Sequence, residues 1–140
     1  MSLVIDSSLT LAWYFPDEGS EETDHLLRRV AVEGAVVPEL WRAEVANGFQ
    51  SAIRRRRIDA DYRDSSLVEL AKLPIAVDPD TNAHVWGATV RLADLYRLTI
   101  YDAIYLELAQ RRRLPLATLD VALATAARGV AVEVLGMARP

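Results

Sequence analysis

The sequence predicts an α/β fold in which a mostly parallel sheet of four or five strands is covered by helices on both faces. Short apolar runs alternate along the chain with longer segments whose apolar residues recur at helical spacing. The chain has 140 residues, the size of one ordinary domain, and no internal repeat, low-complexity segment or linker is visible. We therefore expect residues 1–140 to form a single domain.

The expected helices are bounded by residues that commonly end helices. Pro16 closes the first helix, Gly34 follows the second and Gly129 ends the last. The longest helix carries an apolar face that runs from Trp41 to Ala52. The predicted helices are 7–15, 21–33, 39–57, 60–73, 81–98, 99–113 and 121–129.

The expected strands are short and mainly apolar. The first covers Leu3 to Ile5 and stops at Asp6, and the third is closed by Asp78 and Pro79. The predicted strands are 3–5, 35–38, 74–78, 114–120 and, as a possible fifth, 130–135.

The composition excludes several classes of function. The charge is −4, from 16 Lys and Arg against 20 Asp and Glu, which argues against coating nucleic acid by bulk electrostatics. No cysteine is present, so disulfides, thiolate zinc sites and cysteine nucleophiles are excluded, and two histidines leave carboxylates as the main metal ligands. We see neither a signal peptide nor a membrane span, and we expect a cytoplasmic protein.

Four carboxylates fall where they could meet. Asp6 ends the first strand, Asp120 ends the fourth, and Asp102 lies in the first turn of the sixth helix. The carboxyl ends of parallel strands share one edge of a sheet, where open α/β proteins bind ligands. Glu44 borders the apolar face of the third helix. A carboxylate aimed toward a core is costly unless it is paired, protonated or bound to metal.

The same carboxylates also have simpler structural explanations. Asp6 and Asp120 each precede a predicted helix and could cap it, although Ser7 or Ser8 could take that role after the first strand. Asp102 could belong to a capping-box-like helix start and would favour the positive end of the helix dipole. Caps alone, however, do not predict that the carboxylates converge.

The four acidic positions also carry a family resemblance. The segments VIDSS, PELWRAEVANGF, LTIYDAIYLELA and LATLD, in this order, resemble the PIN-domain family and specifically its VapC-type toxin ribonucleases. The resemblance extends from Leu3 to the last strand. It implies a three-layer α/β/α sandwich whose first strand is central, with an acidic pocket that binds Mg²⁺ or Mn²⁺ and cuts RNA. It also implies a cognate antitoxin protein as partner and a homodimer.

The resemblance implies roles for individual residues. The metal-binding and catalytic acids of the family fall on Asp6, Glu44, Asp102 and Asp120, and supporting positions fall on Ser7, Asn47 and Thr118. After Asp120 there is no clear candidate for the further acidic residue that some members carry, which leaves a second metal open. Oxygen-only ligands suit Mg²⁺ or Mn²⁺, and such an ion can activate water for attack on a phosphodiester.

The arginines allow another role for Glu44 and have two possible roles of their own. Glu44 could pair with Arg42 or Arg55, or be solvated. The runs 54–57 and 111–113 could contact RNA, but cations at helix carboxyl ends are also favoured by the dipole.

Two other functions remain open at this point. A non-catalytic RNA- or protein-binding module would keep the fold without the chemistry. A phosphatase-like enzyme with Asp6 as nucleophile would want a second Asp two residues later, where the chain has Ser8.

Overall fold

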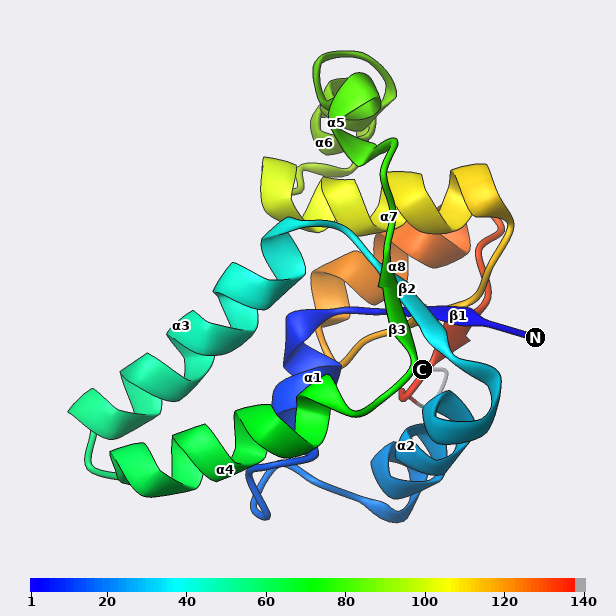
Figure 1. Ribbon diagram of the computed structural model, residues 1–140. Helices are drawn as coiled ribbons and strands as arrows, with labels where there is room; N and C mark the ends of the chain where they lie inside the picture. Colours follow the sequence, from blue (N-terminus) through cyan, green and yellow to red (C-terminus); the bar gives the residue numbers. More distant parts are fainter. Residues whose placement is uncertain (138–140) are drawn as a thin grey trace.

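The computed structural model describes residues 1–137 and contains one five-stranded sheet in which every strand pair is parallel (Figure 1). The strands are β1 (Leu3–Ile5), β2 (Ala35–Val37), β3 (Ile75–Val77), β4 (Leu116–Ala117) and β5 (Val134–Leu135). Their order in the sheet is β3-β2-β1-β4-β5. The first strand is therefore central, as predicted, and its three residues are fully buried.

Eight α-helices and one π-helical segment are found in the described part of the chain. They are α1 (Ser7–Ala12), α2 (Glu21–Glu33), α3 (Leu40–Arg54), α4 (Ala60–Ala71), α5 (Thr81–His84), the π-helix η1 (Val85–Thr89), α6 (Val90–Tyr96), α7 (Ile100–Arg112) and α8 (Val121–Gly129). No helix within residues 1–137 is long and apolar enough to cross a membrane.

The strand order sorts the helices into two layers. Connections between parallel strands are right-handed, so the steps from β1 to β2 to β3 place α1 to α4 on one face. The chain then crosses back from β3 to β4 and β5, which places α5 to α8 on the opposite face. Figure 1 shows this division, with α7 and α8 on one side of the strands and α1, α2 and α4 on the other. The three-layer α/β/α prediction is confirmed.

Three predicted helices differ from the observed ones. The helix expected at 39–57 ends at Arg54, because Arg56 adopts a positive φ of 58° that a right-handed helix cannot continue. The helix expected at 7–15 ends at Ala12. It is followed by tighter turns of the 3₁₀ type, in which backbone hydrogen bonds join residues three positions apart.

The third difference lies in the segment 81–98, which was predicted as one helix. It is divided into α5, η1 and α6, and the wide π turn contains Gly87. Within η1, Thr89 is fully buried whereas Trp86 is 95% exposed. A π turn holds one residue more per hydrogen bond than an α turn, and hydrophobic periodicity does not reveal where it occurs.

Candidate functional site

The carboxyl ends of β1 and β4 lie side by side at the centre of the sheet. Ile5 of β1 pairs with Ala117 of β4, so the residues that follow each strand emerge together. These residues are Asp6 on one strand and Thr118 and Asp120 on the other. The edge at which open α/β sheets bind ligands is therefore lined by two of the four predicted acids.

Asp6 is almost completely buried and is held by three protein donors. Its Oδ1 accepts hydrogen bonds from the Ser8 hydroxyl at 2.7 Å and from the Leu9 backbone N–H at 2.9 Å, and its Oδ2 accepts one from the Thr118 hydroxyl. A carboxylate oxygen has two lone pairs, so Oδ1 is fully used and Oδ2 keeps one free. The side chain can thus offer one oxygen to a further ligand without losing a protein contact.

Thr118 joins the two strand ends. Its hydroxyl donates to Asp6 and accepts a hydrogen bond from the Asp120 backbone N–H at 3.0 Å. Ser8 completes the connection, because its hydroxyl accepts from the Leu119 N–H at 3.0 Å while it donates to Asp6. The predicted supporting position Thr118 therefore lies within the acidic site.

Glu44 comes from α3 and meets α7 at the same edge. Its Oε1 accepts a 2.6 Å hydrogen bond from the Tyr105 hydroxyl. Within residues 1–137 no ion pair joins Glu44 to Arg42 or Arg55, so the alternative of an arginine partner is wrong. Glu44 is half-buried, at the margin of the apolar face, as its position in the helix predicted.

Asp102 is the electrostatic centre of the four acids. Its negative charge contributes to raising the pKa of Asp6 and of Glu44, and the charge of Asp120 contributes to raising the pKa of Asp102 itself. Each of the other three acids therefore interacts electrostatically with Asp102, although the four come from separate segments. Such interactions are those expected of carboxylates near one edge of the sheet.

Burial is the largest cause of the shifted pKa values. It raises the pKa of Asp6 to about 6, against the lowering effect of the hydrogen bonds from Thr118, Leu9 N–H and Ser8. Burial likewise raises the pKa of Glu44 and of Asp102, where Tyr105 and Thr99 respectively oppose it by hydrogen bonding. No Lys, Arg or His of the described residues forms an ion pair with any of the four acids.

The side chains do not form a closed ligand shell as they stand. Among residues 1–137, no three acidic or histidine side chains are arranged so that they could hold one metal ion together. The cluster provides oxygen donors and unbalanced negative charge, which are the properties that Mg²⁺ and Mn²⁺ favour. Since Mg²⁺ usually keeps several of its waters, such a cluster can bind it through water as well as directly.

Two of the predicted supporting residues do not contact the acids. Ser8, and not Ser7, donates to Asp6, and the hydroxyl of Ser7 is close enough to Tyr105 to lower its pKa by hydrogen bonding. Asn47 is exposed, and among the described residues it makes no side-chain hydrogen bond to an acid. Ser8 and Tyr105 are the two contacts that sequence reasoning missed, and only Ser8, two residues after Asp6, had a local signal.

Capping and site formation are combined in the same residues. Asp6 caps α1 through its bond to Leu9, which corrects the expectation that Ser7 or Ser8 would do so. Asp120 caps α8 by accepting from the Leu123 N–H at 2.8 Å. A cap fixes the carboxylate at the end of its strand, so the structural explanation supports the site.

The arginine run 111–113 is committed to the fold through Arg111 and Arg112. Arg111 makes a bidentate contact with Asp78, at 2.8 and 3.3 Å, and a 2.8 Å ion pair with Glu107. Arg112 reaches Asp78 at 3.2 Å. Because Asp78 and Glu107 are buried, Arg111 and Arg112 neutralise interior charge, which gives these two arginines a structural role.

The run 54–57 contributes one arginine to a surface cluster. Arg57 pairs with Asp17 and Glu18 and lies over the ring of Phe15, 4.7 Å from its centroid. Cation–π contact and paired charges fix this guanidinium on the loop after α1. Arg57 therefore has a structural role.

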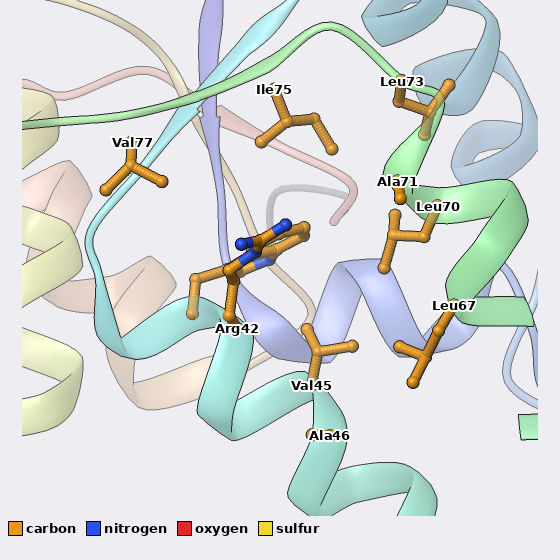
Figure 2. Close-up of a pocket in the computed structure, with 10 residues that line it drawn as sticks. Arg42, Val45, Ala46, Leu67, Leu70, Ala71, Leu73, Ile75 and Val77 are labelled. Carbon is orange, nitrogen blue, oxygen red and sulfur yellow. The ribbon is translucent and has the colours of Figure 1, made fainter. Parts of the chain in front are cut away.

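A separate apolar groove lies between α3, α4 and the edge strand β3. It has a volume of about 440 Å³, and Figure 2 shows its side chains converging from the three elements. Ile75 and Val77 line it from β3, Leu67 and Leu70 from α4, and Arg42 stands at its α3 side. The acids of the site do not line this groove.

Comparison with known proteins places the fold in a family. The family model described as PIN domain matches residues 3–129. Ribonuclease VapC3 of Pyrobaculum aerophilum is 32% identical over 124 residues, which cover 89% of this chain and 93% of that protein.

Solved structures show the same architecture. PAE2754 from Pyrobaculum aerophilum superposes with a TM-score of 0.68 at 23% identity, over 96% of this chain and 92% of that one. FitAcB from Neisseria gonorrhoeae gives a TM-score of 0.62 at 18% identity, over 97% of each chain. With a family model that matches nearly its whole length, and with these relatives, the chain belongs to the PIN domain family.

Proposed function

We propose that this protein is a metal-dependent endoribonuclease and the toxin component of a toxin–antitoxin pair. One observation carries the proposal: Asp6, Glu44 and Asp102 have raised pKa values, Asp102 interacts electrostatically with the other three acids, and none of the four forms an ion pair with a cationic side chain of the described residues. The likeness to Ribonuclease VapC3 supplies the substrate class, because phosphodiester hydrolysis by this donor set does not by itself distinguish RNA from DNA.

A divalent cation fits the donor set of the site. Clustered carboxylates without a cation repel one another, and binding Mg²⁺ or Mn²⁺ removes that repulsion. Asp6, Asp102 and Asp120 would hold the ion directly or through water, with Asp6 using the free lone pair of Oδ2. When bound, the ion supplies an activated water and stabilises charge on the phosphate oxygens.

The side chains of the chain itself set up the reaction. Thr118 and Ser8 keep the Asp6 carboxylate in one orientation, so that no ordering is needed when the substrate arrives. Glu44 would orient the attacking water and accept its proton, while one of its carboxylate oxygens accepts a hydrogen bond from Tyr105.

The proposed partner is an antitoxin protein that docks in the apolar groove of Figure 2. The groove is open beside an edge strand, and β3 exposes Val77 to 42%. An amphipathic or extended segment could bury its apolar side chains there. The segment 7–15, by contrast, packs Leu9, Ala12 and Phe15 into the core.

A homodimer is proposed on a different surface. Trp86 and Leu95, from η1 and α6, are 95% and 70% exposed, and a second copy of the chain would cover them. The expected location, where a ribonuclease meets cellular RNA, is the cytoplasm.

Expression in cells tests the proposed activity and its substrate together. The parent and the Asp6→Asn variant are induced separately, and new RNA 5′ ends are sequenced. We expect growth arrest and a recurrent cut with the parent, and neither with the variant. Equal toxicity and equal cleavage from the variant would refute the site, and a harmless parent without new 5′ ends would favour a non-catalytic binding module.

A further inference from the structure

We propose that Tyr105 is a positioning residue of the acidic site, whose phenol fixes the Glu44 carboxylate without neutralising it. This role rests on the proposed metal-dependent function. Tyr105 lies outside the acidic positions and the hydroxyl positions that the sequence motifs provided.

The placement of Tyr105 follows from helix geometry. It lies three residues after Asp102 on α7, so the two side chains share one face of the helix. Its side chain is 1% exposed, and its hydroxyl donates to Glu44 Oε1 at 2.6 Å. Because α7 and α3 belong to opposite layers of the sandwich, this hydrogen bond joins the two layers at the carboxyl edge of the sheet.

The Tyr105 hydroxyl lies among the acids of the site. Burial, the hydrogen bond to Glu44 and the negative charges of Glu44 and Asp6 all raise the pKa of Tyr105. The phenol is therefore protonated at neutral pH, and toward Glu44 it acts as a donor. A phenylalanine would fill the same space but would leave the half-buried carboxylate without this donor.

A neutral donor suits a site that has to bind a cation. An arginine or lysine beside Glu44 would cancel its charge and compete with the metal ion, as Arg111 cancels the charge of Glu107. Tyr105 uses one lone pair of Oε1 and leaves Oε2 open with the carboxylate charge intact. Fixing a glutamate rotamer before the ion binds also removes the entropic cost of ordering that side chain.

Mn²⁺ binding, measured by electron paramagnetic resonance of the free ion, tests this role without reference to catalysis. The proteins compared are the parent, Tyr105→Phe, Glu44→Ala and the double variant. We expect Tyr105→Phe to weaken Mn²⁺ binding by about 10-fold, the lower end of the range for residues that orient metal ligands. In the Glu44→Ala background the same change should alter the affinity less than about 2-fold, since Tyr105 acts through Glu44.

Two further variants separate positioning from packing. Tyr101→Phe removes a phenol from an exposed position of the same helix, next to Asp102, and should leave Mn²⁺ affinity unchanged. Glu44→Asp keeps the charge but draws the carboxylate away from the phenol, and it should weaken binding even if Tyr105→Phe fails to fold.

The outcomes distinguish this role from the proposed function. If the parent binds Mn²⁺ and both Tyr105→Phe and Glu44→Asp bind it with the same affinity, the positioning role is overturned. The metal site itself would then still stand. An equal loss from Tyr105→Phe with and without Glu44 would also overturn it, because the effect would then not pass through Glu44. A parent that binds no Mn²⁺ would overturn the metal site itself.

Discussion

Acidic side chains near the two ends of α7 differ in whether they have a cationic partner. Toward its carboxyl end, Glu107 and the neighbouring Asp78 are neutralised by Arg111, with Arg112 adding a second contact to Asp78. At its amino end, Asp102 faces three further carboxylates, and no arginine, lysine or histidine of the described residues pairs with them.

The pKa values express this difference. Burial raises the pKa of Asp78, but the hydrogen bonds and charge of the arginines, with the Thr81 hydroxyl, outweigh it and lower the pKa to about 2. Burial raises the pKa of Asp6 to about 6 although three donors hold it. Neutral donors orient a carboxylate but do not replace a cation. A buried carboxylate therefore indicates a binding site only when its positive partner is missing from the fold.

The largest expected effect on stability comes from removing the internal cation. Arg111→Met should lower the free energy of unfolding by about 3–5 kcal/mol, because it leaves Asp78 and Glu107 buried without their main partner. Urea unfolding measures the loss. Arg91→Met, at an exposed position, should change stability by less than about 0.5 kcal/mol. A comparably small effect of Arg111→Met would show that the cluster does not hold α7 in place.

Removing a negative charge from the acidic site should stabilise the protein, the opposite of the effect of removing Arg111. Without metal, Asp6→Asn should raise the free energy of unfolding at pH 7 by up to about 3 kcal/mol, the cost of ionising a carboxyl whose folded pKa is about 6. The amide can still accept from Ser8 and Leu9 and donate to Thr118. Thermal unfolding in a chelator measures this increase in stability. A clear loss of stability in Asp6→Asn would contradict the view that the Asp6 charge destabilises the metal-free protein.

Added metal should stabilise the protein only by binding to the acidic site, whose carboxylates have no cationic partner. At a Mn²⁺ concentration about 100 times the Kd, the expected stabilisation is about 2.7 kcal/mol. Asp102→Asn should abolish most of it, whereas Asp94→Asn, at an exposed position of α6, should retain it. The measurement is the change in Tm with and without Mn²⁺, and an equal change in Asp102→Asn would place the ion elsewhere.

The pH dependence of the metal-free protein should be smaller but distinct. A carboxyl whose folded pKa lies above its unfolded value binds protons more readily when folded, so stability rises as pH falls. From pH 7 to pH 5, Asp6 should add about 1 kcal/mol, and the raised pKa values of Glu44 and Asp102 act in the same direction. Asp78 contributes stability that is lost only below its unfolded pKa, toward about 2. Falling stability between pH 7 and 5, followed by urea unfolding, would contradict these assignments.

Sequence reasoning predicted the fold and the acidic positions because both depend on local patterns. The alternation of apolar runs and helical segments predicted the parallel sheet, and the pairing of β1 with β4 brings the residues that follow them, among them Asp6 and Asp120, to the same edge of the sheet. It missed the π-helix in 81–98, because no residue type in the segment marks where a helix widens by one residue per turn.

Contacts between distant segments were harder to predict. The bond from Tyr105 to Glu44 joins residues 61 positions apart, and that from Arg111 to Asp78 spans 33. Neither follows from periodicity, since which polar side chains meet depends on how the layers pack. For this reason Arg111 looked like part of a surface run and proved to be the counter-charge of two buried acids.

Cleavage of RNA by the purified protein tests whether the acidic edge of the sheet is the catalytic site. The parent, Asp102→Asn and Asp94→Asn are incubated with structured RNA in Mn²⁺, Mg²⁺ or chelator. We predict cleavage by the parent and by Asp94→Asn with either ion, none in chelator, and a loss of at least about 100-fold in Asp102→Asn, since even residues that only orient ligands cost roughly 10–100-fold. Cleavage by Asp102→Asn at the parent's rate would contradict the assignment of the acidic edge as the catalytic site.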